Sequence, residues 1–252
     1  MTGHSIKTLA MTSLAMAAAL TMLSLGAATA ADLGEADEAM ANPSVNWTGF
    51  YFGVNAGRGW GKSRWTFNDN NNQIEHGLGG VEIGVHGGYQ RQWGHLIAGI
   101  EADVDGASLD GASSCPNLKF DCTTKVSGLE SVRGRLGFSA GKMHVYGTAG
   151  LAMEQITHHT VEPTNPTNNE SAQGGNLHGW VAGGGLEVLL APNANIGIEV
   201  LHYNFAQQTL DLTKDISGNV VSDVTFAAQG ENVVRLRFTM MLNGAAQHEP
   251  MK

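Results

Sequence analysis

The chain has 252 residues and a formal net charge of −9, and only 15% of its residues are charged. A nucleic-acid partner is not expected, because nucleic-acid-binding domains are usually basic. Apolar residues make up 42% of the chain and there are 34 glycines against 6 prolines, which favours a folded, turn-rich protein over disorder.

The first residues predict a secretory signal. Lys7 precedes an alanine- and leucine-rich stretch from residue 9 to 26, and Ala28-Thr29-Ala30 fits a small-residue cleavage site. We therefore expect residues 1–30 to be a signal peptide and the acidic residues 31–46 to be a linker. The alternative is a retained helical anchor, which the serines and threonines of the stretch disfavour. No later apolar run is long enough for a transmembrane helix.

Eight later segments alternate apolar and polar residues with the period of two that is typical of strands. Each is about 10 to 14 residues long, which suits a tilted strand that crosses a bilayer. All six prolines lie outside these segments, where a missing N–H does no harm. The segments are residues 47–61, 80–92, 96–105, 128–139, 144–155, 178–190, 195–205 and 233–242.

The connections between these segments alternate between long and short. Long ones are expected at residues 68–77, 106–125, 157–176 and 207–231, and short ones at 93–94, 140–142 and 192–193. The fold class predicted is all-β: an eight-stranded antiparallel up-and-down transmembrane β-barrel over residues 47–242, with short periplasmic turns and four long outer loops. Aromatic girdles are expected from Trp47 and Trp93 at the inner level, and from Trp60, Trp65 and Trp180 at the outer level.

One face of residues 96–105 is apolar, and the other carries Glu101, Asp103 and Asp105. Arginines alternate in the same way in residues 132–138 and 233–242. A barrel with an apolar outside and a charge-paired inside satisfies all three segments. A proton or ion path is the alternative, but eight strands leave room for side chains rather than an open pore. The expected interior charges are Glu82, Glu101, Asp103, Asp105, Arg133, Arg135, Glu154, Glu187, Glu199, Arg235 and Arg237.

The ordered motifs resemble one protein family. They are WTGFYFG from Trp47, GIEAD from Gly99, VRGRLGF from Val132, YGTAGLA from Tyr146 and GWVAGGGLE from Gly179. This set is similar to the small alphaproteobacterial outer-membrane proteins, an opacity-protein-like porin family of β-barrels that includes surface antigens and haemin-binding proteins.

The resemblance implies an outer-membrane location, contact with outer-membrane lipid and insertion by the barrel assembly machinery. It places the linker in the periplasm. Family members usually end on an aromatic residue, whereas here Leu242 holds that place and a C-terminal tail of residues 243–252 follows.

Candidate sites for chemistry are few. His158 and His159, in an expected outer loop near Glu162, could capture haem or a metal, and His76 lies in another such loop. The chain has no CxxC or HExxH pattern, and loop histidines are usually just solvated. We therefore expect no metal and no cofactor, with haem as the alternative.

Catalysis has no clear carrier in the sequence. His202 is expected on the outward face of its strand, without a serine or acid partner, and Gly183-Gly184-Gly185 lacks the lysine and helix of a phosphate loop. An enzyme is therefore not expected. Cys115 and Cys122 predict a disulfide within an exported loop, with two free thiols as the alternative.

The function predicted is that of a structural or surface protein, a barrel that anchors in the outer membrane and displays its loops, with an interior closed by charges. A haem- or small-ligand-binding surface barrel is one alternative. A soluble lipocalin-like periplasmic carrier is another, and it requires an apolar inside and a polar outside.

Overall fold

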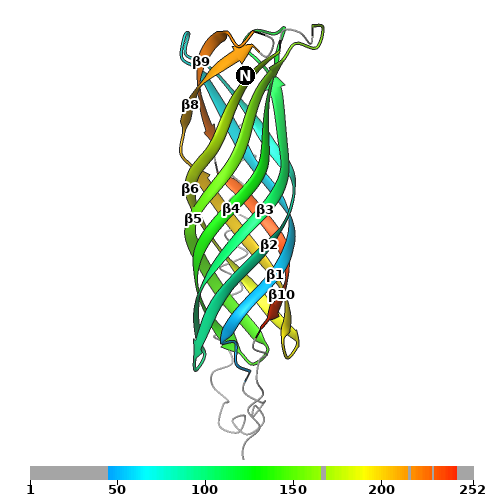
Figure 1. The fold of residues 1–252 in the computed structure, drawn as a ribbon, viewed down its shortest axis with the longest axis vertical. Helices are drawn as coiled ribbons and strands as arrows, with labels where there is room; N and C mark the ends of the chain where they lie inside the picture. The colour runs from blue at the N-terminus through cyan, green and yellow to red at the C-terminus, as the bar shows by residue number, and fades with distance from the viewer. Residues whose placement is uncertain (1–44, 166–168, 215–216, 229, 243–252) are drawn as a thin grey trace, which may run out of the picture. The chain divides into compact units, whose positions relative to one another are not determined.

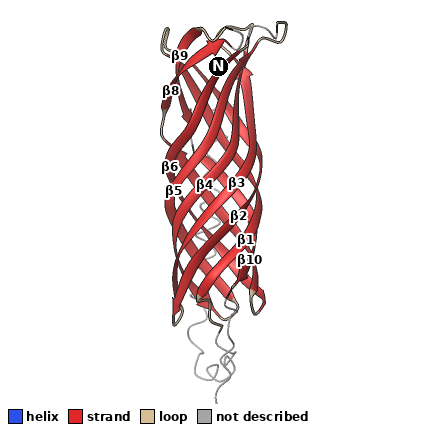
Figure 2. Cartoon of the chain, in the orientation of Figure 1, coloured by secondary structure: helices blue, strands red, loops and turns tan. Residues whose placement is uncertain are grey.

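The computed structural model describes residues 45–165, 169–214, 217–228 and 230–242. Val45 begins a compact unit, and every regular element that the structure describes in it is a strand (Figure 2). Within the described residues, no helix is long and apolar enough to cross a membrane. The predicted signal peptide, the linker up to residue 44 and the tail from residue 243 lie outside the described residues.

Eight strands form a closed antiparallel ring (Figure 1). Neighbours in the chain pair from β1 to β7, β7 pairs with β10, and β10 closes the ring on β1, where Val54 faces Phe238. The predicted all-β ring of eight antiparallel strands is confirmed. The strands of this ring are β1 (Gly49–Phe67), β2 (Asn72–Trp93), β3 (Leu96–Ser114), β4 (Asp121–Ala140), β5 (Met143–Val161), β6 (Glu170–Ala191), β7 (Ala194–Phe205) and β10 (Glu231–Met241).

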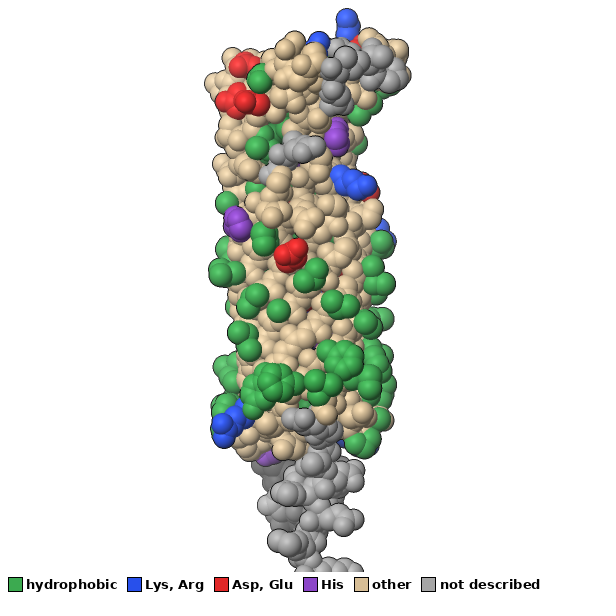
Figure 3. Space-filling model, viewed as in Figure 1, with side chains coloured by type: hydrophobic (Ala, Val, Ile, Leu, Met, Phe, Trp, Pro, Cys, Tyr) green, Lys and Arg blue, Asp and Glu red, His purple; other side chains and the backbone are tan. Residues whose placement is uncertain are grey.

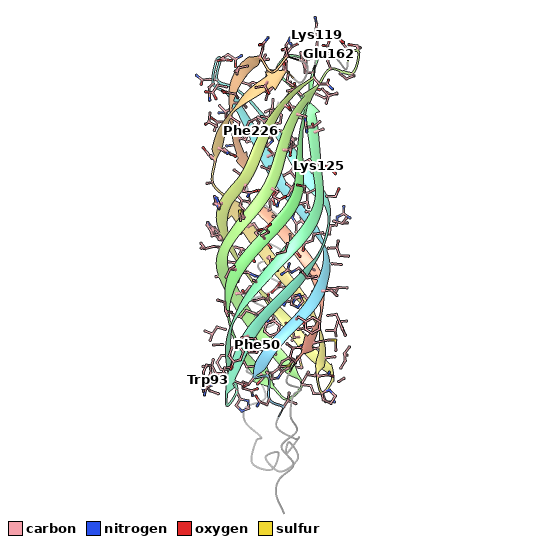
Figure 4. The ribbon with its side chains drawn as sticks, viewed as in Figure 1. Phe50, Trp93, Lys119, Lys125, Glu162 and Phe226 are labelled. Atoms are coloured by element: carbon pink, nitrogen blue, oxygen red, sulfur yellow. A yellow bond between two sulfur atoms is a disulfide. The ribbon has the colours of Figure 1, made fainter. Side chains whose placement is uncertain are left out.

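The two ends of the ring differ. At one end, here called the turn end, tight turns join β2 to β3, β4 to β5 and β6 to β7. Gly94 and Gly141 adopt the left-handed backbone conformation that these turns need, with φ of 60° and 58°. The opposite end is called the loop end. Phe50 and Trp93 lie near the turn end, and Lys119 and Glu162 lie at the loop end (Figure 4).

The prediction of four long outer loops is wrong. β1 and β2 are joined by residues 68–71, β3 and β4 by 115–120, and β5 and β6 by 162–169. The fourth expected loop forms a hairpin of β8 (Gln208–Lys214) and β9 (Val220–Ala228). The outward side chains of these segments are mostly polar, with Val220 of β9 among the few exceptions. Their polar composition therefore looked like that of loops although the backbone stays extended.

The β8–β9 hairpin takes the places of β7 and β10 at the loop end. β9 pairs with β1 over Ser63–Phe67, and β8 pairs with β6 at Glu170 and Ser171. Among the described residues, ladders are incomplete there: β2 and β3 pair only from Gly79–Asp110 onward, and β6 has no ladder partner on the β8 side from residue 172 to 178. The described loop end thus consists of two four-stranded half-sheets, β3-β4-β5-β6 and β8-β9-β1-β2.

The outer surface carries a continuous apolar belt. Large apolar side chains point outward from every strand of the ring, and in Figure 3 they gather over the lower half of the visible face. The strands between the belt and the loop end are mostly polar outside. Each strand of the ring contributes at least one belt residue that is 46% or more exposed. In strand order, examples are Phe52, Ile83, Ile100, Leu136, Val145, Leu190, Ile198 and Leu236.

The tryptophans divide between the two faces of the barrel. Trp60, Trp93 and Trp180 are exposed at the edges of the belt, as predicted, but Trp47 and Trp65 are 0% exposed inside the barrel. The girdle prediction is therefore wrong for these two. Both share the odd-numbered parity of the inward residues of β1, and parity rather than position along the strand decides which face a side chain takes.

Candidate functional site: the barrel interior

The interior of the barrel is a stack of layers. At the turn end an apolar layer closes it, formed by the buried side chains of Trp47, Tyr51, Ile97, Leu189 and Met241. The segment before β1 is tied into this closure, because Gln90 Nε2 donates to the Trp47 carbonyl at 2.9 Å and the Trp47 amide donates to Gln92 Oε1 at 2.8 Å.

Above this closure lies an arginine layer, which consists of Arg133, Arg135, Arg235 and Arg237 with the carboxylates around them. Glu101, 1% exposed, accepts hydrogen bonds from Arg133 Nη2 at 2.6 Å, from Arg135 Nη1 at 3.0 Å and from both Nη atoms of Arg237. The Tyr51 hydroxyl donates to Glu101 Oε2 at 3.1 Å. Such charge-assisted hydrogen bonds are the strong kind, and they fix each guanidinium in place.

Glu199 is the second centre of the arginine layer. It accepts from Arg235 Nε at 2.8 Å and from Arg237 Nη1 at 2.9 Å, and Arg133 Nη1 lies 3.3 Å away. Arg235 Nη1 donates to Asp105 Oδ2 at 2.9 Å. Strands β3, β4, β7 and β10 are therefore joined across the interior as well as around the ring.

Aromatic rings complete the arginine layer. The Arg135 guanidinium carbon lies 3.8 Å from the centre of the Tyr146 ring, and Arg135 Nη2 donates to Glu187 Oε1 at 2.7 Å. Tyr146 in turn donates to Glu199 Oε1 at 2.8 Å. An arginine stacked on a ring and bonded to carboxylates is held in one orientation.

The arginine layer contains all the predicted interior charges except Glu154. Its four arginines face six carboxylates: Glu82, Glu101, Asp103, Asp105, Glu187 and Glu199. Glu82 lies at the margin, with Oε1 3.8 Å from Arg235 Nη1. Every side chain of this layer is buried, so the layer packs the barrel interior. Each guanidinium is bonded to carboxylates rather than to passing ions.

Glu154 lies inside the barrel, as predicted, but it pairs with none of the arginines and is not part of the arginine layer. It lies one layer higher, beside Glu231, among buried apolar side chains that include Leu129, Leu177 and Val233. Glu154 and Glu231 are both 0% exposed. Sequence reasoning missed Glu231, because it stands at the first position of β10, where the alternation begins.

Histidines and hydroxyls form the next layer toward the loop end. His76 Nε2 and His158 Nδ1 lie 2.9 and 3.1 Å from Thr124 Oγ1, which also accepts a hydrogen bond from Trp65 Nε1 at 3.0 Å. The His158 ring stacks on Phe226 with centroids 3.8 Å apart. Burial lowers the pKa of His158 to about 3 and lowers the pKa of His76 as well, so both rings are neutral at pH 7.

The placement of the histidines in loops is therefore wrong. His76 lies on β2, and His158 and His159 lie on β5. His158 is 1% exposed inside the barrel, whereas the neighbouring His159 belongs to the opposite face of the strand and is partly exposed. The two rings do not converge on one ligand, and haem binding by them stays a prediction.

A last apolar layer, here called the outer apolar layer, lies at the loop end. It is formed by the buried side chains of Trp65, Ala172, Leu212, Val224 and Phe226 with the disulfide of Cys115 and Cys122. Phe226 lies below Lys119 and Glu162 in Figure 4. The predicted disulfide is confirmed, and Cys122 proves to be part of β4 rather than of a loop.

His202 lies on the outer face of β7. Its Nδ1 is 3.0 Å from Asn232 Oδ1, and its ring is 5.6 Å from that of Trp180. The hydrogen bond joins two neighbouring strands at the edge of the belt, and Asn232 is an amide rather than the acid of a catalytic pair.

The molecule thus has apolar side chains outside and charged side chains inside. Within the belt, each strand of the ring pairs with both of its neighbours. A family model described as "Outer membrane protein beta-barrel domain" matches residues 15–222. The chain belongs to this outer-membrane β-barrel family. Its location in the outer membrane follows, and the charged interior is the reverse of what the soluble carrier alternative requires.

Two relatives illustrate the membership of this outer-membrane barrel in the family. The "31 kDa outer-membrane immunogenic protein" of Brucella melitensis is 30% identical over 218 residues, which covers 75% of this chain and 88% of that protein. The "22 kDa outer membrane protein" of Rhizobium leguminosarum is 29% identical over 178 residues, which covers 70% of this chain and 73% of that protein.

The fold is also similar to a solved structure. The outer membrane protein OprG from Pseudomonas aeruginosa matches with a TM-score of 0.53 at 9% identity, covering 77% of this chain and 97% of OprG. At this identity the likeness concerns the fold alone.

Proposed function

We propose that the protein is a closed outer-membrane barrel that anchors in the bilayer through its belt and presents a strand-built extension to the outside of the cell. The turn end faces the periplasm and the loop end faces the medium, as short turns and longer outer strands do in barrels of this kind. The barrel acts as an anchor and a display platform rather than as a channel.

The observation that carries this proposal is the contrast between the two parts of each long strand. Strands β1 to β6 have 19 to 22 residues, whereas a tilted strand needs about 9 to 11 to cross a bilayer. The remaining length is polar outside, so it extends beyond the lipid. The name of the Brucella relative, an immunogenic protein, supports exposure of this part to antibodies.

Insertion of a short epitope tests the orientation. We would place it after Thr164, in the connection from β5 to β6, and in a second variant after Gly141, in the turn from β4 to β5. An antibody should label the first variant on intact cells, and the second only after the outer membrane is permeabilised. Equal labelling of the two variants on intact cells, or labelling of the Gly141 variant alone, would contradict the proposal.

A further inference from the structure

A cavity of about 280 Å³ lies at the loop end, above the outer apolar layer. Its walls come from both half-sheets, with Phe67, Leu212 and Val221 from one and Thr160 and Glu170 from the other, and Phe120 is added by the connection between β3 and β4. The volume is just below the range of about 300 to 1,000 Å³ that small-molecule sites occupy, so a ligand must be small. Exposed residues of the connections, such as Asn70 and Asn117, form its rim.

The cavity is closed below. Leu212 belongs both to its wall and to the outer apolar layer, in which Trp65 and Phe226 are 0% and 1% exposed. The histidine layer and the layer around Glu154 follow beneath. A molecule that enters from the loop end therefore stops there, so the cavity is shaped for binding rather than for passage.

The lining indicates the chemistry of a ligand. The two charged residues in the wall, Glu170 and Lys214, have opposite signs and are direct cross-strand partners, and Thr160 Oγ1 donates to Glu170 Oε2 at 3.0 Å. Their charges offset one another. What remains is two phenyl rings and aliphatic side chains, with amides at the rim, which is the composition that small apolar ligands find in their sites.

Few ladder pairs join the two half-sheets around the cavity. The two half-sheets are joined around it by the β6–β8 pairs at Glu170 and Ser171, while β2 and β3 do not pair beyond Gly79. Beyond Gly79, β2 and β3 are held together by side chains rather than by a ladder, since Ser113 Oγ lies 3.3 Å from His76 Nδ1.

We propose that this cavity binds a small, uncharged aromatic molecule from the medium outside the cell. The rings of Phe67 and Phe120 would contact its face or edge, and the amides of Asn70 and Asn117 would bond a hydroxyl on it. This activity goes beyond anchoring and display, because it needs a ligand that neither the belt nor the arginine layer engages.

The test uses the full chain in lipid nanodiscs and 4-nitrobenzyl alcohol, an uncharged aromatic probe that quenches tryptophan fluorescence. Trp65 lies in the floor beneath the cavity, whereas Trp60, Trp93 and Trp180 lie in the belt. Probe that dissolves in lipid quenches the belt tryptophans in proportion to its concentration. Probe that binds the cavity adds a saturable component, and Trp65→Phe should remove it.

Two matched pairs of variants locate the saturable component. Val221→Lys places a charge in the cavity wall, and Val220→Lys places it on the adjacent residue, outside the lining. Phe120→Ala removes a wall ring, and Leu118→Ala changes a residue of the same loop that is 87% exposed. The first member of each pair should weaken binding by about tenfold or more, and the second should leave it unchanged.

Purely linear quenching in the wild type, or equal saturable binding in both members of a pair, would overturn the proposal. A heat-dependent gel shift in every variant reports an intact barrel, so a folding failure is visible separately. If Val221→Lys loses that shift, the Phe120 and Leu118 pair decides the outcome.

Discussion

At the scale of single residues, three arginines share the carboxylate of Glu101 inside the barrel. Removing one partner of a buried ion pair costs about 3–5 kcal/mol, because the remaining charges stay buried without their counterion. We expect Glu101→Gln to lower the free energy of unfolding by about that amount, measured by urea unfolding with the gel shift as readout.

The control for Glu101 is Glu75→Gln. Glu75 pairs with Lys62 and Arg64 at 2.7 and 3.0 Å on the outer surface, where its side chain is 35% exposed. Exposed pairs contribute about 0–1 kcal/mol, so this variant should unfold almost like the wild type. Similar losses in the two variants would mean that the arginine layer contributes no more than a surface pair.

His158 gives the loop end a dependence on pH. Its pKa is about 3 in the folded protein against an ordinary value of 6.5. Below pH 6.5 the unfolded chain gains a proton that the folded one does not bind, so the stabilisation is complete above pH 6.5 and declines as the pH falls toward 3. The expected loss reaches about 1.4 kcal/mol per pH unit.

The pH dependence is measured as urea stability of the loop end between pH 7 and pH 4, followed through Trp65 fluorescence. His158→Gln should reduce the slope, because the variant side chain does not titrate, and the remaining slope would come from His76, whose pKa burial also lowers. His159→Gln, a change at the adjacent and partly exposed residue, should keep it. An unchanged slope in His158→Gln would assign the acid sensitivity to other groups.

At the scale of elements, the disulfide closes the connection between β3 and β4. It joins residues seven apart, and a loop of this size gains about 2 kcal/mol from the link. Replacing both cysteines by serine should speed amide exchange in residues 116–121 and in the neighbouring strand ends, while exchange in the belt stays slow. Faster exchange throughout the belt would show that the two parts of the barrel unfold together.

The strands show why the sequence predicted one part of the fold and not the other. Within the belt one face meets lipid and the other meets charges, so each strand has a strict alternation, and the ring and its inward residues could be derived. Beyond the belt the outer face meets water. The aliphatic signal then disappears, and polar strands cannot be distinguished from loops by composition.

More of the barrel interior could have been predicted by continuing the alternation of inward and outward residues beyond the belt. Trp65 continues the inward parity of Tyr51, His76 that of Glu82, and His158 that of Glu154. The histidine layer could therefore have been predicted from the alternation of inward and outward residues. The cavity was not, because its walls come from half-sheets whose separation depends on the ladders that stop at Gly79 and Gly179.

At the scale of the whole molecule, the stacked layers predict a barrel that does not conduct ions. Apolar layers close both ends, and the arginine layer fills the interior between them. In planar bilayers the purified protein should give no stepwise conductance, whereas a wide porin inserted in the same chamber does. Stable, uniform steps from the purified barrel would show a path through these layers.

The incomplete ladders mark a boundary in the backbone itself. Hydrocarbon leaves an unpaired N–H or C=O without a partner, so a sheet edge is tolerated in water and not in lipid. Pairing between β2 and β3 stops at Gly79, the cross-strand neighbour of Trp60, and the gap along β6 ends at Gly179, next to Trp180. The ends of the ladders and the exposed tryptophans therefore lie at the same level, where we expect the outer surface of the bilayer.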